Sequence, residues 1–449
     1  MPNATQHSRR RFLKRSAQAA ASVAVAPYFI PNSVLAAPGT AGANDRIGLA
    51  IIGYGTRGGQ HWGYLPKGLA RVVAVCDVNL PRAEAAAAKI DGHPKAFQDY
   101  RRVLDRNDVD AVIVATPDHW HALITIHACQ AGKDVYCEKP LSLTVKEGRA
   151  MVTAARNHGR VVQTGSQQRS MERNRTACEM VINGRAGKIH TVIGNNYPSP
   201  WRCKYSAQPV PSGLDWDMWC GQIDPFPYHE QLYICRALPG WASLREVCGG
   251  EICNWGSHGL DQVQMALQMD HTGPVEVSCE GGAIPNYTYT QPEGNPKIHD
   301  IYRQELKHQV VYRYANGVEL RLVDGPPGGA VFIGDRGKIT IDRGRYVAEP
   351  NEIATEAIRS DEIHLPPAGG DVPGHLTNWF NCIKNREKPI ADIEIGHRTV
   401  TLGHLGNISR WLGRKLQWDP EQEVFPHDEE ANAYLERPRR KPYQLPEVL

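Results

Sequence analysis

The sequence has few of the features that define small metal-binding, disulfide-rich or membrane-spanning proteins. Its eleven cysteines are scattered along 449 residues, and none forms a Cys-x-x-Cys pair. This spacing argues against a zinc ribbon and against a small disulfide framework. We expect most of the cysteines to be buried thiols, with one or two disulfides within residues 203–253 as the alternative. No histidine has metal-ligand spacing to other donors, so we predict no metal site.

An excess of charge of one sign is also missing. The formal net charge is +3, but residues 1–43 carry five Lys or Arg residues and no Asp or Glu. The rest of the chain has 46 basic and 48 acidic residues, a net charge of −2. A near-neutral protein gives no electrostatic reason to expect a nucleic acid or a membrane surface as a partner.

Residues 1–43 have the pattern of an export signal. A twin arginine occurs in SRRRFLK at residues 8–14, and a mildly apolar, alanine-rich stretch covers residues 17–37. Small residues then offer cleavage sites after Ala36 and after Ala43. The segment resembles a twin-arginine signal peptide, which predicts export to the periplasm or another extracytoplasmic compartment.

A short membrane anchor is the alternative interpretation of this segment. Pro27 and Pro31 interrupt its apolar run, which makes it a weak candidate for a span. No other segment approaches the length of a transmembrane helix. We therefore expect no membrane span in the mature chain.

Residues 44–168 alternate apolar runs with amphipathic stretches. Runs typical of strands occur at residues 47–53, 71–76, 111–116, 134–137 and 161–165. Helical patterns lie between them at residues 81–90, 119–131 and 144–158. Continuous apolar strands separated by helices indicate a parallel sheet covered on both faces. The sequence predicts a doubly wound α/β domain, the Rossmann type, over residues 44–168.

The pattern changes after residue 170. A helix at 170–183 and a strand at 188–197 are followed by an irregular Pro-, Trp- and Tyr-rich stretch at 198–245. Later runs alternate with period two, at residues 275–279, 309–314, 318–323 and 338–342, and helices return at 374–385 and 394–412. These patterns predict an α+β domain with an antiparallel sheet over residues 169–418, whose last helices pack back on the first domain. A charged, Pro-rich tail at 419–449 is expected to wrap the surface.

A glycine-rich turn follows the first predicted strand. It comprises Gly53, Tyr54, Gly55, Thr56, Arg57 and Gly58. Its glycines allow a tight turn, close approach of a pyrophosphate and close helix–strand packing. The N–H groups at the start of the following helix, at the positive end of its dipole, would bind the phosphates. Asp77 ends the next strand, 19 residues beyond Gly58, where a carboxylate binds ribose hydroxyls and repels a 2′-phosphate. We predict an NAD site, with NADP less favoured; a turn without ligand and a merely solvated Asp77 are the alternatives.

Two further segments follow predicted strands. They are Thr116-Pro117-Asp118-His119-Trp120-His121 and Glu138-Lys139-Pro140. Ligands of open α/β sheets bind beyond the carboxyl ends of the strands, where both segments fall. A lysine there can act as an acid, a base or a hydrogen-bond donor to a substrate hydroxyl; a structural role for Lys139 is the alternative.

Together these motifs resemble the Gfo/Idh/MocA oxidoreductase family, which includes glucose–fructose oxidoreductase and inositol dehydrogenase. In that family the lysine matched by Lys139 lies beside the nicotinamide and the reacting carbon. The resemblance implies a Rossmann domain joined to a large, open-faced, mainly antiparallel sheet, through which members form homodimers or homotetramers. It implies cofactor contacts from Thr116, Pro117, His119, His121, Glu138, Gln167 and Arg169. For His119 and His121, helix capping is the alternative.

A second family pattern lies after the paired glycines at 249 and 250. Spacings of four and three place Asn254, His258 and Asp261 on one helical face. The family resemblance makes His258 catalytic, whereas Asn254 stands where the family has an aspartate. An amide cannot exchange a proton at neutral pH, so proton transfer is expected of His258 and Lys139, while Asn254 orients a substrate hydroxyl. Asp261 either orients His258 or has a structural role, as a cap or as an ion-pair partner.

Aromatic side chains supply candidates for a sugar site. Because aromatic rings stack on the apolar faces of sugars, Trp120, Trp201 and Trp241 are candidate substrate contacts, as is Arg202; core or interface packing is the alternative. The resulting hypothesis is an exported, NAD-dependent oxidoreductase acting on a secondary alcohol of a sugar, glycoside or polyol, with glycoside C3 as one candidate position. Because no free nicotinamide pool exists outside the cytoplasm, we expect a tightly bound cofactor. An NAD-recycling glycoside hydrolase and a non-catalytic sugar-binding protein are the alternatives.

Overall fold

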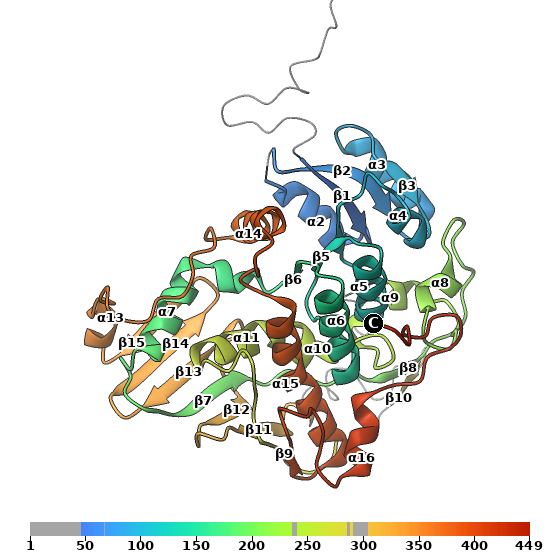
Figure 1. Cartoon of the computed structure of the whole chain (residues 1–449). Helices are drawn as coiled ribbons and strands as arrows, with labels where there is room; N and C mark the ends of the chain where they lie inside the picture. The colour runs from blue at the N-terminus through green and yellow to red at the C-terminus, as the bar shows by residue number, and fades with distance from the viewer. Residues whose placement is uncertain (1–45, 67, 236–239, 285–287, 291–303) are drawn as a thin grey trace, which may run out of the picture. The chain divides into compact units, whose positions relative to one another are not determined.

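The structure is a computed structural model that describes residues 46–449 except 67, 236–239, 285–287 and 291–303 (Figure 1). The expected signal peptide and both cleavage sites lie outside the described residues. Within those residues, no helix is long and apolar enough to cross a membrane. All eleven cysteines fall in the described part of the chain and are free thiols, so the disulfides considered for 203–253 do not form in this structure.

The first sheet has six parallel strands in the order β3-β2-β1-β4-β5-β6. These strands are β1 (Ile47–Ile52), β2 (Ala70–Cys76), β3 (Lys95–Phe97), β4 (Ala111–Val114), β5 (Asp134–Cys137) and β6 (Val162–Thr164). The central strands β1, β4 and β5 are buried along their whole length, which explains their continuous apolar runs. The predicted Rossmann domain is confirmed, with β3 as an additional short strand.

Helices cover both faces of this sheet. They are α2 (Thr56–Tyr64), α3 (Leu80–Lys89), α4 (Arg101–Leu104), α5 (His121–Gln130) and α6 (Val145–Asn157), with one-turn helices η2 (Asp118–Trp120) and η3 (Gln167–Ser170). Along β1, Ala50 and Ile52 pack in the cluster that contains α5 and α6. Leu49 and Ile51 face the opposite cluster, which contains α3. The period-two alternation of β1 therefore divides its side chains between two hydrophobic layers.

The second of these layers is completed from the far end of the chain. Helix α14 (Val372–Asn385) inserts Trp379 and Phe380, both wholly buried, against the first sheet. Burial of one such aromatic ring stabilises a fold by about 3–5 kcal/mol relative to alanine. Helix α14 thus packs on the first domain.

The second sheet has eight strands in the order β15-β14-β13-β7-β12-β11-β9-β16. They are β7 (Ile189–Asn195), β9 (Glu276–Glu280), β11 (Gln309–Arg313), β12 (Glu319–Val323), β13 (Gly329–Gly334), β14 (Gly337–Asp342), β15 (Arg345–Glu349) and β16 (Leu416–Gln417). Only the β7–β12 pair is parallel. This confirms the predicted mainly antiparallel sheet.

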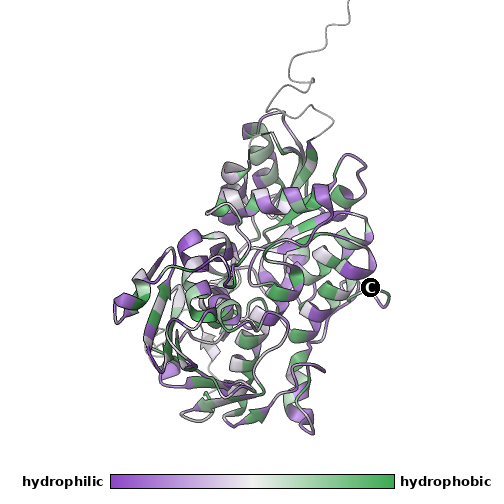
Figure 2. Cartoon of the chain, turned by 60° about the vertical axis from the view of Figure 1, so that its left-hand side comes forward, coloured by the Kyte–Doolittle hydropathy of each residue, from purple (hydrophilic) through white to green (hydrophobic). Residues whose placement is uncertain are grey.

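One face of this sheet is covered by helices (Figure 1). The helices of this half are α7 (Glu172–Ile182), α10 (Gly250–Asn254), α11 (Gly256–Ala266), α13 (Glu352–Thr355) and α15 (Ile393–Leu412). Along β12, Leu320 and Leu322 are buried while Glu319 and Arg321 are partly exposed on the other face. Along both strands and helices, hydrophobic and hydrophilic residues occur close together in sequence (Figure 2).

The irregular stretch after β7 contains short elements only. They are β8 (Arg202–Lys204), which pairs with β10 (Thr288–Thr290), and α8 (Trp216–Cys220), α9 (Glu230–Tyr233) and η4 (Trp241–Ser243). We call residues 213–235 the aromatic cap, because rings such as Trp216 and Trp219, stacked at 4.5 Å between centroids, form a hydrophobic cluster there. The cap docks on the segment after β2: the Asp215 amide donates to the Val78 carbonyl at 2.9 Å.

The C-terminal segment, residues 419–449, is mostly exposed or half-buried and is held by ion pairs and hydrogen bonds to other parts of the chain. It contains α16 (Glu429–Asn432) and η5 (Ala433–Leu435). Arg437 and Arg439 pair with the buried Glu147 of α6 at 2.8 and 3.0 Å. Arg440 donates from Nε to the Gly221 carbonyl in the cap at 2.7 Å. The segment therefore ties the cap to the first domain.

Candidate active site

The glycine turn between β1 and α2 has the geometry of a phosphate-binding loop. Gly53 has φ +87°, in the region that favours glycine, and its amide donates to the Cys76 carbonyl at 2.8 Å. A Cβ on Gly55 would meet no heavy atom within 4 Å, whereas one on Gly58 would lie 2.1 Å from the Gly53 carbonyl oxygen. No side chain caps the first turn of α2. Gly55 therefore leaves room for a ligand beside free helix amides, and Gly58 permits the close packing behind the turn.

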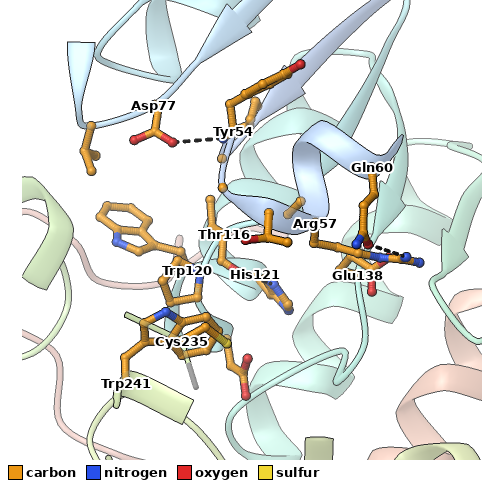
Figure 3. Close-up of a pocket in the computed structure, with 18 of the residues that line it drawn as sticks. Tyr54, Arg57, Gln60, Asp77, Thr116, Trp120, His121, Glu138, Cys235 and Trp241 are labelled. Carbon is orange, nitrogen blue, oxygen red and sulfur yellow. Dashed lines mark hydrogen bonds and ion pairs between the residues drawn. The ribbon is translucent and has the colours of Figure 1, made fainter. Parts of the chain in front are cut away.

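The turn opens into a cavity of about 1130 Å³ at the carboxyl ends of the parallel strands. Pockets for drug-sized ligands occupy about 300–1,000 Å³, so this one has room for a dinucleotide and a small substrate. The sequence-predicted residues that line it are Gly53, Tyr54, Gly55, Thr56, Arg57, Asp77, Thr116, Pro117, Trp120, His121, Glu138, Lys139, Gln167, Trp241, Asn254 and His258. In Figure 3, Asp77 lies on one side of the turn that carries Tyr54, and Arg57 and Glu138 lie on the other.

Asp77 marks one end of the cavity, which we call the Asp77 end. Its carboxylate accepts hydrogen bonds from the amides of Tyr54 and Asn79, both at 2.9 Å. Arg82 lies 3.5 Å away. Burial raises the pKa of Asp77 above its usual value, although Arg82 and the two amides counteract the rise. The carboxylate is thus held in a fixed orientation at the wall of the cavity.

The aromatic cap covers the Asp77 end. Met218, Trp219, Tyr233, Ile234 and Cys235 of the cap line the cavity. The Arg82 guanidinium lies 4.9 Å from the centre of the Tyr233 ring. On the other side, the Leu80 amide donates to the Gly213 carbonyl at 3.0 Å. Nothing in the sequence signalled this role, because it depends on a contact between segments far apart in the chain.

Glu138 is the centre of a buried ion-pair cluster. Its Oε1 accepts from Arg57 Nε and faces His61 Nε2, both at 2.7 Å. Burial alone would raise its pKa, but the charge of Arg57 and the hydrogen bond from His61 hold the pKa of Glu138 well below its usual value. Arg57 also donates to Gln167 at 3.2 Å. Glu138 therefore locks the glycine turn to the end of β5.

Lys139, Asn254 and His258 meet at the other end of the cavity, the Lys139 end. Lys139 Nζ donates to Asn254 Oδ1 at 2.7 Å. Asn254 ends α10 and His258 lies in the first turn of α11, and both line the same cavity. Burial, with the charges of Lys139 and Arg343, holds the pKa of His258 well below its usual value. The imidazole is therefore neutral near pH 7 and available as a hydrogen-bond or proton acceptor.

His121 joins the two signature segments. Its Nδ1 lies 2.8 Å from the Pro140 carbonyl and its Nε2 lies 2.9 Å from the Thr116 carbonyl. Burial lowers its pKa, but Cys137 and Asp118 outweigh that effect and raise the pKa to about 10. A protonated ring with two donors matches its two carbonyl partners. His121 thus fixes the loops that carry Thr116 and Lys139.

Four predicted contacts lie away from the cavity, and these assignments are corrected. Arg169 and Asp261 pair with each other at 2.7 Å, and Arg169 also pairs with Asp270 at 2.6 Å, because buried charges need opposite charges. Trp201 is buried and donates to Glu305 at 2.8 Å. Arg202 is exposed on β8. Of the two roles considered for Asp261, the structural one holds.

Two more predicted cofactor residues stand behind the cavity wall. His119 is fully buried, and its Nε2 lies 2.9 Å from the Trp219 carbonyl, so it supports the cap instead of lining the cavity. Gly58 acts through packing alone. Arg343 and Trp255 line the cavity without having been predicted as site residues. Trp255 lay inside the Asn254–His258 motif, whereas no sequence signal points to Arg343, which enters from the turn between β14 and β15.

In the described residues, no group of three or more His, Cys, Asp and Glu side chains is arranged to hold a metal ion. The fold and the cavity define a class: a Rossmann protein whose dinucleotide site shares one cavity with residues of a second, sheet-based domain. The chain belongs to the Gfo/Idh/MocA oxidoreductase family. The model of its NAD-binding Rossmann fold matches residues 47–166, and the model of its C-terminal alpha/beta domain matches residues 185–445. The family resemblance of the motifs is thereby confirmed.

Individual relatives are more distant. Inositol 2-dehydrogenase of Salmonella typhimurium is 32% identical over 150 residues, which are 33% of this chain and 45% of that protein. 1,5-Anhydro-D-fructose reductase of Ensifer adhaerens is 35% identical over 212 residues, 47% of this chain and 53% of the relative. The chain thus matches about half the length of these curated relatives.

Solved structures share the fold. The WlbA dehydrogenase from Bordetella pertussis, in complex with NADH and UDP-GlcNAcA, superposes with a TM-score of 0.57 at 20% identity, over 83% of this chain and 99% of that chain. Aldose-aldose oxidoreductase from Caulobacter crescentus gives a TM-score of 0.56 at 18% identity, over 83% and 99% of the two chains. At these identities the likeness establishes the two-domain architecture.

Proposed function

We propose that the protein is an NAD-dependent oxidoreductase that oxidises or reduces a secondary alcohol of a sugar, glycoside or polyol. The observation that carries the proposal is the convergence of Lys139, Asn254 and His258 in the cavity that the glycine turn opens into. The inositol dehydrogenase and anhydrofructose reductase among its relatives support a carbohydrate as substrate. When bound, NAD supplies the hydride acceptor or donor.

The chain's own residues handle the proton and the orientation of the substrate. Lys139 donates a hydrogen bond to the reacting oxygen, and Asn254, which accepts from Nζ at 2.7 Å, holds that lysine in place. Neutral His258 accepts the hydroxyl proton during oxidation and returns it during reduction. The side chains of Trp120, Trp241 and Trp255 supply rings that bind the apolar face of a sugar.

The Asp77 end supports NAD over NADP and a slowly released cofactor. The fixed Asp77 carboxylate accepts hydrogen bonds from ribose hydroxyls and repels a 2′-phosphate. The aromatic cap, held by Val78 on one side and by Arg440 on the other, would restrict escape of the adenosine half. Retention of NAD agrees with the proposed twin-arginine export of residues 1–43, since that route carries folded proteins with their cofactors.

The central experiment is direct. The protein is purified from a host with twin-arginine export. One portion is denatured, and the released nucleotide is identified. A second, native portion is screened with glycosides, sugars and inositols for NADH-like absorbance. NAD release and reduction by at least one carbohydrate are expected. No reduction with any of them would overturn the proposal. Aglycone release from a nitrophenyl glycoside without net reduction would instead identify an NAD-recycling hydrolase.

Export and assembly are tested separately. Cell fractionation should find the Arg9→Lys/Arg10→Lys variant in the cytoplasm and the wild-type protein outside it. Light scattering should give a homodimer or homotetramer, the assembly that family members form through the second sheet. Cytoplasmic wild-type protein would contradict the export proposal, and a monomer would contradict the proposed assembly.

A further inference from the structure

Arg343 reaches the Lys139 end of the cavity from the second domain. It occupies the tight turn between β14 and β15, with φ +20°, a conformation that few residues other than glycine adopt. Its guanidinium lies 5.3 Å from the centre of the Trp255 ring, and that ring lies 5.6 Å from the His258 ring. The side chain is exposed while it lines the cavity, which places it at the mouth beside the proposed catalytic residues.

The carboxylate of Asp342, the residue before Arg343, is bound by other groups. Asp342 Oδ2 pairs with Arg345 at 2.6 Å, and its Oδ1 accepts from the Gly328 amide at 3.0 Å. Among the ion pairs of the described residues, none involves Arg343. Its guanidinium packs against the face of Trp255. The five N–H donors of this guanidinium thus face the cavity and solvent.

Most charges around the Lys139 end lie near an opposite charge. Glu138 is neutralised by Arg57. Asp118 interacts with the protonated His121 and also, more weakly, with Lys139. Lys139 interacts with Glu138 and Asp118 and donates to Asn254. The guanidinium of Arg343 has no carboxylate partner among the ion pairs of the described residues, and its charge, like that of Lys139, disfavours a proton on His258. A neutral substrate would leave the charge of Arg343 uncompensated at the mouth of the cavity, whereas an anionic substrate would balance it.

We propose that Arg343 binds an anionic group on the carbohydrate substrate, a carboxylate or a phosphate, and thereby selects acidic sugars over neutral ones. The inference rests on the proposed oxidoreductase function and refines its substrate class. The planar guanidinium matches both anions with paired hydrogen bonds, and Trp255 below it limits its orientations. Arg343 is a binding residue here and takes no part in proton transfer.

The experiment compares matched ligands on holoenzyme. Methyl glucuronide, methyl glucoside and a hexose monophosphate are assayed for kcat/KM and, independently of turnover, for binding by calorimetry. We expect an anionic ligand to be favoured by roughly tenfold to a hundredfold over methyl glucoside, the range of a charge-assisted hydrogen bond. A preference for the glucuronide identifies a carboxylate, and a preference for the phosphate identifies a phosphate ester.

Variants assign the preference to the residue. Arg343→Met should abolish the preference for the anionic ligands over methyl glucoside, and Arg343→Lys should restore part of it. Arg345→Met, in the same hairpin but paired with Asp342, is the control and should keep the preference. Equal anionic preference in wild type and Arg343→Met, or none in wild type, overturns the inference. Arg343-dependent binding without turnover would overturn only the proposed function.

Discussion

The two ends of the cavity are built in different ways. The Asp77 end is formed largely by one continuous stretch, from the turn at Gly53–Gly58 to the aspartate that ends the next strand. At the Lys139 end, the side chains come from the segment after β5, from α10 and α11, and from the β14–β15 turn, which are far apart in the chain. Beneath the aromatic cap, the first end depends on local backbone conformation, whereas the second depends on how two domains pack.

Because of this difference, we expect the Asp77 end to set the affinity for the cofactor and the Lys139 end to set the rate of the reaction. Residues of the glycine turn act through their backbone and through the absence of side chains. Residues of the Lys139 end act through side-chain charge, as the depressed pKa of His258 shows. Substitutions at one end are therefore expected to leave the property of the other end intact, and the following predictions test that independence.

The largest effect is expected at the Lys139 end. Lys139→Met and His258→Ala each remove a group that handles the substrate hydroxyl, and kcat should fall by roughly 10²–10⁴-fold. The NAD content after gel filtration should not change. Lys146→Met, at an exposed lysine of α6, serves as the control and should be fully active. Full activity in either variant would remove that residue from the proposed mechanism.

A pair of glycine substitutions tests the Asp77 end. Gly58→Ala places a Cβ 2.1 Å from a carbonyl oxygen and should destabilise the fold by about 1–3 kcal/mol, measured by urea unfolding. Gly55→Ala meets no protein atom within 4 Å, so its stability should match wild type while bound NAD is lost. If both variants kept their cofactor, the turn would not be the phosphate site.

The pH dependence should also differ between the ends. Because the pKa of His258 lies well below 6.5, the decline of kcat/KM on the acid side should occur only below that pH. Removing the Arg343 charge favours the protonated imidazole, so Arg343→Met should move this decline to higher pH. Retention of NAD should be the same in Arg343→Met and in the wild type at each pH, because Asp77 lies at the other end of the cavity, where burial raises its pKa and Arg82 counteracts the rise. An unmoved decline in Arg343→Met would contradict the assignment of His258 as the proton acceptor.

The smallest effect concerns the aromatic cap. Tyr233→Leu removes the ring against which Arg82 packs, a contact worth about 0.5–1 kcal/mol at a partly exposed site. The rate of NAD release, measured by dilution and rapid filtration, should become about two- to fivefold faster. Val210→Ala, at an exposed residue before the cap, is the matched control. Unchanged release in Tyr233→Leu would show that the cap does not retain the cofactor.

Much of the fold was predictable, and the exceptions have physical reasons. β1, β2, β4, β5 and β6 were found because continuous apolar runs mark strands covered on both faces. β3 has only three residues and its Lys95 is exposed, so it leaves no such run. In the second sheet, β13 begins and ends with glycine, and the edge strand β15 exposes Val347. Both fall short of the period-two pattern that identified their neighbours.

Prediction of the site followed the same division. Residues in motifs, such as Gly55, Asp77 and Lys139, line the cavity as expected. Arg169 was assigned to the site by the family resemblance and Asp261 by its helical spacing to His258, yet the two pair with each other in the interior. A sequence shows that a charge exists and cannot show which distant charge it meets. Trp201 and Arg202 were misplaced for the same reason, since their surroundings depend on how the irregular stretch folds.

The glycine turn, Asp77, and the lysine and histidine that identify the family can be recognised in the sequence, because these features rely on local geometry and residue type. Four contacts are visible only in the folded chain: Asn254 accepts from Lys139, Asp261 pairs with Arg169, the aromatic cap covers Asp77, and Arg343 enters the site. Each of these contacts joins segments far apart in the chain. Their energies depend on burial and on neighbouring charge, and both quantities are set only when the domains pack.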